Sequence, residues 1–150
     1  MTHPELKEAI KGAMRAKDTV RLSVLRGLSA AATNELVSKS RKPDEMLSDD
    51  ELLTVIMRAS KQRKDSIEQF VAGGRPELAE SEKAELAIIE TMLPAQMSQG
   101  EIEKAAKEKA AAMGVVDKTG ANKLMGMLMK DLKGKADGTM VKDVVDKLFS

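Results

Sequence analysis

The chain has 150 residues, of which 33% are charged and 42% hydrophobic, a composition typical of one globular domain or two small ones. Its 25 basic and 24 acidic residues leave a net charge of +1, so no global field attracts nucleic acid and we expect no DNA binding. The absence of cysteine excludes disulfides and thiolate metal sites, and no apolar run approaches the roughly 18 residues of a membrane span. Together with an N-terminus that lacks the apolar core of a signal peptide, these features predict a cytoplasmic protein without membrane association.

The residue pattern predicts an all-α, multihelical fold, because strand-like alternation of Val, Ile and Thr is absent and Ala, Leu, Glu, Lys and Met dominate. The first helix begins at a capping box formed by Thr2 and Glu5, and its expected apolar stripe is Leu6, Ile10 and Met14. We interpret His3, the single histidine, as part of this local helix start rather than as a base or a metal ligand.

The second predicted helix, residues 18–40, has a clean apolar stripe and a basic beginning. The cations around this beginning form either a solvated face or a phosphate-contacting surface; they are Arg15, Lys17, Arg21 and Arg26. After a polar loop over residues 39–47, a second capping box at Ser48 begins the third helix.

A break at residues 73–76, Gly-Gly-Arg-Pro, separates the third predicted helix from the fourth. Arg63 interrupts the apolar seam of the third helix, and antiparallel folding about the break brings it opposite Glu82 and Glu85. A cation on the buried side of a helix must be paired, so we predict a structural ion pair among these three residues. The fourth helix is expected to bury Leu78, Leu86, Ile89 and Leu93.

Pro94 cannot continue a helix, and a third capping box follows it at Ser98. We therefore predict two subdomains, a four-helix N-terminal bundle over residues 1–94 and a three-helix C-terminal bundle over residues 95–150. The sixth predicted helix, near residues 121–133, is rich in methionine, and Met127 and Met129 lie outside its main apolar stripe. These methionines are either buried between neighbouring helices or form a binding surface.

The chain contains none of the familiar catalytic motifs, such as HExxH, GxSxG, a Walker loop or GxGxxG, and we expect neither a metal nor a cofactor. One local feature suggests ligand binding: lysines flank two glycines in a turn that leads into a helix N-terminus, an arrangement suited to phosphate. Asp137 opposes this interpretation by competing for the same backbone amides. The candidate residues are Lys130, Lys133, Gly134, Lys135, Gly138 and Lys142.

Two stretches carry a family resemblance, LSDDELLTVIMRASKQRKDSIEQFVAGGRPELAESEKAELAIIETMLP and KLMGMLMKDLKGKADGTMVKDVVDKLF. They resemble the GatB/YqeY family, and specifically its stand-alone members related to the tail domain of the B subunit of glutamyl/aspartyl-tRNA amidotransferase. The resemblance implies four helices followed by three, and a C-terminal part that contacts tRNA near its elbow. The residues that fit the tail motif are Lys133, Gly134, Lys135, Asp137 and Gly138.

The resemblance also links the chain to carbon–nitrogen ligase activity with glutamine as amide donor, but the catalytic body and the glutaminase subunit have no counterpart in 150 residues. Our first hypothesis is a tRNA-binding accessory module without its own catalytic machinery, with a possible protein partner in tRNA amidation or translation. The second is a helical adaptor that docks a partner through the Met-rich sixth helix. The third, an amidotransferase in its own right, requires amide formation from glutamine and charged tRNA without other subunits.

Overall fold

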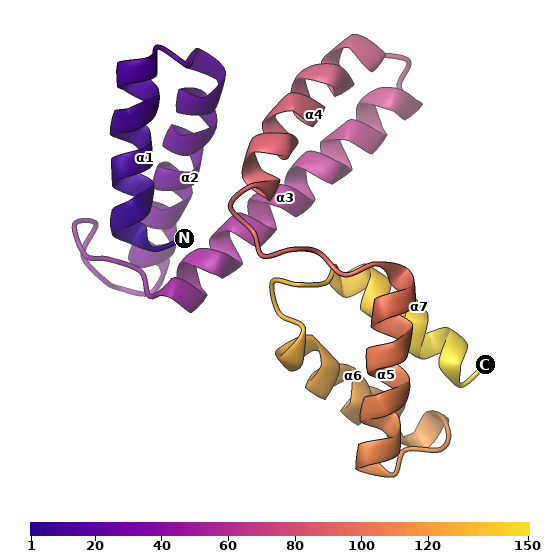
Figure 1. The fold of residues 1–150 in the computed structure, drawn as a ribbon. Helices are drawn as coiled ribbons and strands as arrows, with labels where there is room; N and C mark the ends of the chain where they lie inside the picture. Colours follow the sequence, from indigo (N-terminus) through magenta and orange to yellow (C-terminus); the bar gives the residue numbers. More distant parts are fainter. The chain divides into compact units, whose positions relative to one another are not determined.

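The computed structural model describes residues 1–150 and contains seven α-helices, one short 3-10 turn and no strand (Figure 1). This confirms the all-α, multihelical prediction. The elements are α1 (His3–Ala16), α2 (Thr19–Ser38), α3 (Asp49–Ala72), α4 (Pro76–Glu90), α5 (Gln99–Met113), η1 (Lys118–Gly120), α6 (Ala121–Asp131) and α7 (Gly138–Leu148).

The chain divides into two compact units, Met1–Leu93 and Pro94–Ser150. Each unit encloses its own cluster of buried apolar side chains. The sequence predicts separate subdomains over residues 1–94 and 95–150, and their independent folding stays a prediction.

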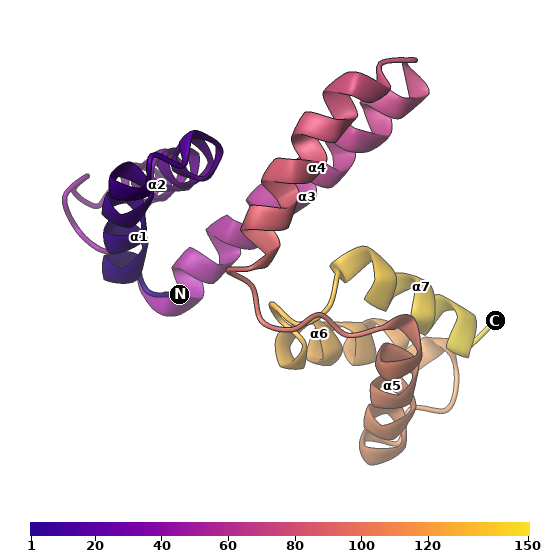
Figure 2. The ribbon, with the colours of Figure 1, turned by 45° about the horizontal axis from the view of Figure 1, so that its top comes forward.

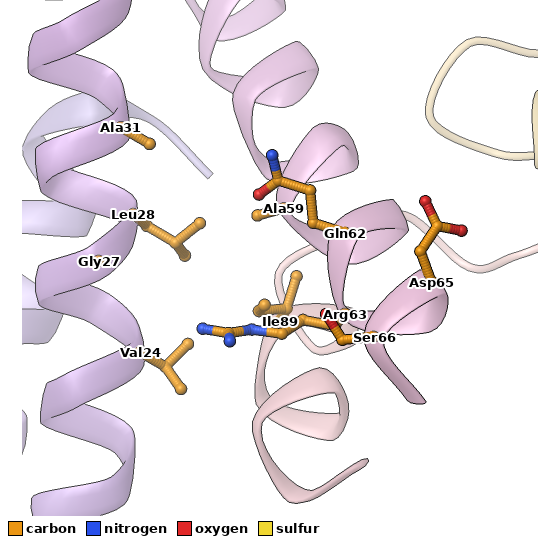
Figure 3. Close-up of a pocket in the computed structure, with 10 residues that line it drawn as sticks. All are labelled: Val24, Gly27, Leu28, Ala31, Ala59, Gln62, Arg63, Asp65, Ser66 and Ile89. Carbon is orange, nitrogen blue, oxygen red and sulfur yellow. The ribbon is translucent and has the colours of Figure 1, made fainter. Parts of the chain in front are cut away.

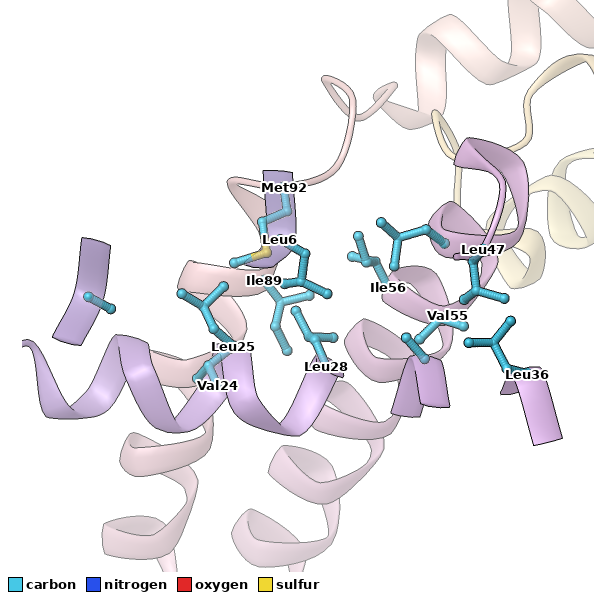
Figure 4. Packing of buried hydrophobic residues seen from close by; sticks show 13 residues of the cluster. Leu6, Val24, Leu25, Leu28, Leu36, Leu47, Val55, Ile56, Ile89 and Met92 are labelled. Atoms are coloured by element: carbon cyan, nitrogen blue, oxygen red, sulfur yellow. The ribbon is translucent and has the colours of Figure 1, made fainter. Parts of the chain in front are cut away.

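The first unit consists of two antiparallel helix pairs, α1 with α2 and α3 with α4 (Figures 1 and 2). Capping boxes at Thr2 and Ser48 fix the beginnings of α1 and α3, as the sequence pattern predicted. The two pairs share one core, to which all four helices and the loop before α3 contribute (Figure 4). Its largest fully buried side chains are Leu6, Leu25, Leu36, Leu52, Ile56 and Ile89.

Two of the predicted core positions in this unit are wrong. Met14 is 52% exposed and its neighbour Ala13 is buried, while Leu78 is 37% exposed and its neighbour Ala79 is buried. The apolar pattern favoured the larger side chain of each pair as the buried one. In the structure the alanine of each pair, Ala13 or Ala79, is the buried residue, since a small side chain lets two helices approach closely.

The loop between α2 and α3 is held by Glu51, the third residue of α3. Its carboxylate accepts hydrogen bonds from Lys39 Nζ at 2.8 Å and from Arg41 Nη1 at 2.9 Å. The bond from Lys39, with further bonds from Ser48 and Arg41, holds the pKa of Glu51 well below its usual range. The loop thus has a fixed course, and its last residues fold back toward the beginning of α1.

His3 lies at the helix start, as predicted, but it also makes a long-range contact with this loop. The side chain is buried, and its Nδ1 accepts a hydrogen bond from the backbone N–H of Leu47 at 2.8 Å. The neutral ring that accepts at Nδ1 carries its proton on Nε2. Sequence spacing gave no sign of this bond because its partners are far apart in the chain.

The His3 contact predicts a loss of stability in acid. Burial, and then the nearby charge of Lys7, lower the pKa of His3 below its ordinary value of 6.5. A group whose pKa is lowered on folding contributes stability that is complete above 6.5 and is lost as the pH falls through the lowered pKa. We expect the difference in free energy of unfolding between the wild type and His3→Ala to be largest near neutral pH and to shrink in acid. Urea titrations over this pH range measure the difference, and a constant difference would contradict the prediction.

The second unit packs α5, α6 and α7 around a small core. A capping box at Ser98 begins α5, and Gly114, with φ of 70°, ends it in the left-handed conformation that glycine adopts readily. The core is built from one apolar face of each helix and includes Ile102, Ala106, Leu124, Leu128, Val141 and Val145. None of the helices in either unit is both long and apolar enough to span a bilayer.

Candidate functional site

The segment between α6 and α7 is a fixed turn. Gly134 adopts φ of 80°, a left-handed conformation that strains any residue with a Cβ atom. The backbone N–H groups of Lys135 and Ala136 both donate to the carbonyl oxygen of Leu132, at 2.9 and 3.1 Å. Gly134 and Ala136 are buried, whereas Lys133 and Lys135 are exposed. The backbone therefore holds these two lysines on the surface of a rigid turn.

Residues at the beginning of the second unit fasten the turn from its other side. The backbone N–H of Met97 donates to the carbonyl oxygen of Lys135 at 2.7 Å. The side-chain amide of Gln96 donates to the carbonyl oxygen of Gly134 at 2.8 Å. Because both carbonyl groups are engaged by the protein, the lysine side chains are the part of the turn that remains available to a ligand.

The N-terminus of α7 is already capped by the chain. The carboxylate of Asp137 accepts a hydrogen bond from the backbone N–H of Thr139 at 2.8 Å. A Cβ atom on Gly138 would lie 3.4 Å from Met129 Cε, an ordinary van der Waals contact. Since a carboxylate occupies the place where an anion would bind, contact with phosphate falls to the lysine ammonium groups.

The four candidate lysines, Lys130, Lys133, Lys135 and Lys142, are all exposed and have no ion-pair partner in the structure. The nearby carboxylate of Asp131 pairs with Lys109 at 2.9 Å. We call these four residues the lysine turn. Asp131 and Asp137, the two acids between Lys130 and Lys142, thus already have partners in the protein, while Asp143, next to Lys142, offsets part of the positive charge.

The structure also brings Arg63, Glu82 and Glu85 together. Arg63 Nη1 lies 3.1 Å from Glu82 Oε2 and 3.0 Å from Glu85 Oε2, with all three side chains no more than about one-third exposed. The antiparallel pairing of α3 and α4 produces this arrangement. Two carboxylates around one guanidinium leave no free positive charge for a substrate, so the geometry supports a structural role.

A cleft of about 440 Å³ opens between α2 and α3 beside Arg63 (Figure 3). Val24, Gly27 and Ala31 of α2 line one side, and a Cβ atom added at Gly27 would meet nothing within 4 Å. Arg63 points from α3 toward Val24. The sequence pattern did not predict this cleft, and its one available signal was a pair of small residues one turn apart on α2, Gly27 and Ala31.

The Met-rich helix α6 is partly exposed. Leu124 and Leu128 are buried, but Met127 and Met129 are each 37% exposed. No three His, Asp or Glu side chains gather in a way that could hold a metal ion. The lysine turn and these methionines are therefore two candidate binding surfaces of the second unit.

Comparison with known proteins gives a family match over almost the whole chain. A family model described as Yqey-like protein matches residues 3–149. A protein of Pyrenophora tritici-repentis named "Altered inheritance of mitochondria protein 41, mitochondrial" is 32% identical over 134 residues, covering 89% of this chain and 72% of the relative. The proteins of the same name from Kluyveromyces lactis and Saccharomyces cerevisiae are 41% and 29% identical over 93 and 133 residues. These matches cover 59% and 88% of this chain and 48% and 68% of the relatives, so the chain spans about half the length of the Kluyveromyces protein.

The names of these relatives contradict the predicted cytoplasmic location, because all three are named as mitochondrial proteins. The prediction relied on the absence of cysteine and of an apolar signal sequence. Neither feature separates the cytosol from other reducing compartments, and mitochondrial targeting segments are amphipathic and rich in arginine rather than apolar.

Proposed function

The chain belongs to the YqeY-like family, and from this we propose that it is an accessory module that binds tRNA through the lysine turn. The resemblance to the amidotransferase tail domain supports tRNA as the ligand. It also suggests a protein partner in tRNA amidation or translation, with the chemistry carried out by that partner.

The observation that carries the proposal is a set of four exposed lysines, two on a fixed turn and two on the helices that flank it, none of which has an ion-pair partner. Lysine ammonium groups bind phosphate as point charges and do not need a base sequence. The chain has only two aromatic residues, Phe70 and Phe149, and both are partly buried. It therefore has little with which to stack unpaired bases, which favours recognition of the shape and backbone of folded RNA.

A second candidate function is supported by the exposed methionines of α6. Met127 and Met129 are flexible, polarisable side chains that adapt to an apolar partner surface. In this case the chain would be an adaptor for a partner helix. Such binding would be insensitive to salt and would be lost in Met127→Asp.

Fluorescence anisotropy with total tRNA, at low and near-physiological salt, tests the first proposal. If the lysine turn makes about three phosphate contacts, the logarithm of the binding constant should fall with the logarithm of salt concentration at a slope of roughly −2 to −3. We expect Lys133→Glu/Lys135→Glu to weaken binding about tenfold or more at low salt and to flatten this slope, because two contacts are lost and two repulsive charges gained.

Lys104→Glu/Lys107→Glu is the matched control. It changes the same total charge in the same unit, and both lysines are exposed on α5. An equal loss of binding in the two variants would show that only net charge matters and would reject the lysine turn as the site. If the wild type failed to bind tRNA even at low salt, the proposal itself would be wrong.

A further inference from the structure

The seven arginines of the chain fall into two groups. Four of them are paired with glutamates: Arg41 with Glu51, Arg58 with Glu35, Arg63 with Glu82 and Glu85, and Arg75 with Glu77. The other three, Arg15, Arg21 and Arg26, have no carboxylate at ion-pair distance. The unpaired arginines all lie between residues 15 and 26, at the end of the first unit where α1 turns into α2. This division by location marks a surface whose arginines form no close ion pair with a carboxylate of the chain.

The connection between α1 and α2 is short and fixed. Lys17, with φ of 55°, ends α1 in the left-handed conformation, and the backbone N–H of Asp18 donates to the carbonyl oxygen of Ala13 at 3.1 Å. Arg15 lies in the last turn of α1, and Arg21 follows in the first turn of α2. The turn therefore gathers Arg15, Lys17 and Arg21 at one end of the helix pair, and Arg26 lies about 8 Å farther along α2.

Acidic residues compensate this charge only in part: the pKa of Glu8 is lowered mainly by its hydrogen bond from Lys11 and, to a smaller extent, by the charge of Arg15. Residues 11–26 contain five cations and one acid, Asp18. The Asp18 carboxylate caps α2 by accepting a hydrogen bond from the backbone N–H of Arg21 at 3.1 Å. Lys11 is the one cation of this stretch with an ion pair, to Glu8 at 3.0 Å. We call the remaining four residues, Arg15, Lys17, Arg21 and Arg26, the arginine turn.

We propose that the arginine turn is a second phosphate-binding surface, which contacts the backbone of the same tRNA as the lysine turn. This inference rests on the proposed function. Arginine presents a planar fork of donors that matches two phosphate oxygens, whereas the lysine turn offers only single ammonium groups. The arginine turn would thus supply the oriented, bidentate contacts that the lysine turn lacks.

An anionic membrane is a weaker candidate for this surface. A helix that lies on a membrane inserts a continuous apolar face. The apolar faces of α1 and α2 are already buried in the core of the first unit, through Leu6, Ala13, Leu25 and Leu28. Met14 and Val20 are exposed near the arginine turn, but two separate side chains do not make such a face.

The two surfaces lie on different units of one chain, so binding at one raises the effective concentration of the other near the same RNA. Either surface alone makes few contacts and binds weakly. A chain with a net charge of only +1 can then hold RNA through two local concentrations of positive charge.

The experiment is tRNA binding by the full chain, followed by fluorescence anisotropy over a range of salt. We expect Arg15→Gln/Arg21→Gln to weaken binding roughly tenfold and to make the salt dependence shallower by one to about two units of log–log slope, because about two phosphate contacts are lost. Glutamine keeps the helix propensity of arginine, so the fold should be retained, which circular dichroism verifies.

The matched control is Arg58→Gln/Arg75→Gln, which removes the same charge from two arginines that are exposed but paired. We expect this variant to bind tRNA as the wild type does. If Arg15→Gln/Arg21→Gln bound as tightly as its control while Lys133→Glu/Lys135→Glu lost binding, the second surface would be rejected and the lysine turn would stand. If neither the wild type nor any variant bound tRNA, the proposed function itself would be wrong.

Vesicles that contain about 30% phosphatidylserine separate the membrane alternative from the RNA one. Vesicle binding by the wild type that Arg15→Gln/Arg21→Gln abolishes, with tRNA binding unchanged, would overturn the proposal in favour of a lipid surface. Loss of tRNA binding without any vesicle binding would support it.

Discussion

Replacing Leu25 by alanine is expected to lower the free energy of unfolding of the first unit by about 3 kcal/mol. Leu25 is completely buried at the centre of the cluster shared by α1, α2, α3 and α4. Truncation removes apolar contacts and leaves a cavity that a close-packed core refills only in part. Urea unfolding followed by far-ultraviolet circular dichroism is the suitable measurement, since the chain has neither Trp nor Tyr to report by fluorescence.

Val37→Ala is the control for this prediction. Val37 lies on the same helix, α2, but is 55% exposed, so its truncation should change the free energy by no more than about 0.5 kcal/mol. Equal effects of the two substitutions would contradict the buried position of Leu25.

The same variant tests whether the two units fold independently. If they do, hydrogen exchange in Leu25→Ala should accelerate throughout residues 1–93 and remain unchanged in residues 94–150. Faster exchange in both units would show that they unfold together and that the division at Pro94 is not a folding boundary.

Local chemistry made the helices predictable. Thr2, Ser48 and Ser98 each begin a helix with a glutamate three residues later, and the structure contains all three capping boxes. Gly114 ends α5 through its left-handed backbone conformation, whereas α4 ends at Glu90, earlier than the proline at position 94 indicated. Such signals need only neighbouring residues, which is why the sequence reveals them.

Contacts between distant segments were harder to predict. His3 looked like part of a helix start because its partner, Leu47, is reached only when the loop before α3 has folded. The buried positions of Ala13 and Ala79 were not predicted, because a pattern of apolar residues does not indicate the distance between packed helices. The cleft beside Gly27 was missed for the same reason.

The candidate site was predictable only as a set of residues. The sequence places Lys133 and Lys135 in a glycine-containing turn, but it does not show that Met97 and Gln96 fasten that turn. Nor does it show that Asp131 is committed to Lys109, which is what leaves the lysines without a partner. Charge pairing depends on which side chains meet, and this follows from tertiary packing.

Tertiary packing leaves the lysines without ion-pair partners, but it surrounds Arg63 with two carboxylates, those of Glu82 and Glu85. Its guanidinium lies 3.1 Å from Glu82 and 3.0 Å from Glu85, between the two helices of the α3–α4 pair. Exposed ion pairs contribute little to stability, whereas removal of one member of a buried pair is costly. The side chains here are between 19% and 32% exposed, which places the network between these limits.

We therefore expect Arg63→Met to lower the free energy of unfolding by about 2 kcal/mol, since two neighbouring carboxylates lose their shared counter-ion. The triple variant Arg63→Met/Glu82→Gln/Glu85→Gln should recover most of this loss, because no unpaired charge remains between the helices. Arg63→Lys should retain part of the stability, since a single nitrogen, Nη1, makes both contacts in the wild type. Urea unfolding of the three variants measures these differences. A triple variant as unstable as Arg63→Met would mean that the arginine stabilises the helix pair by packing rather than by charge.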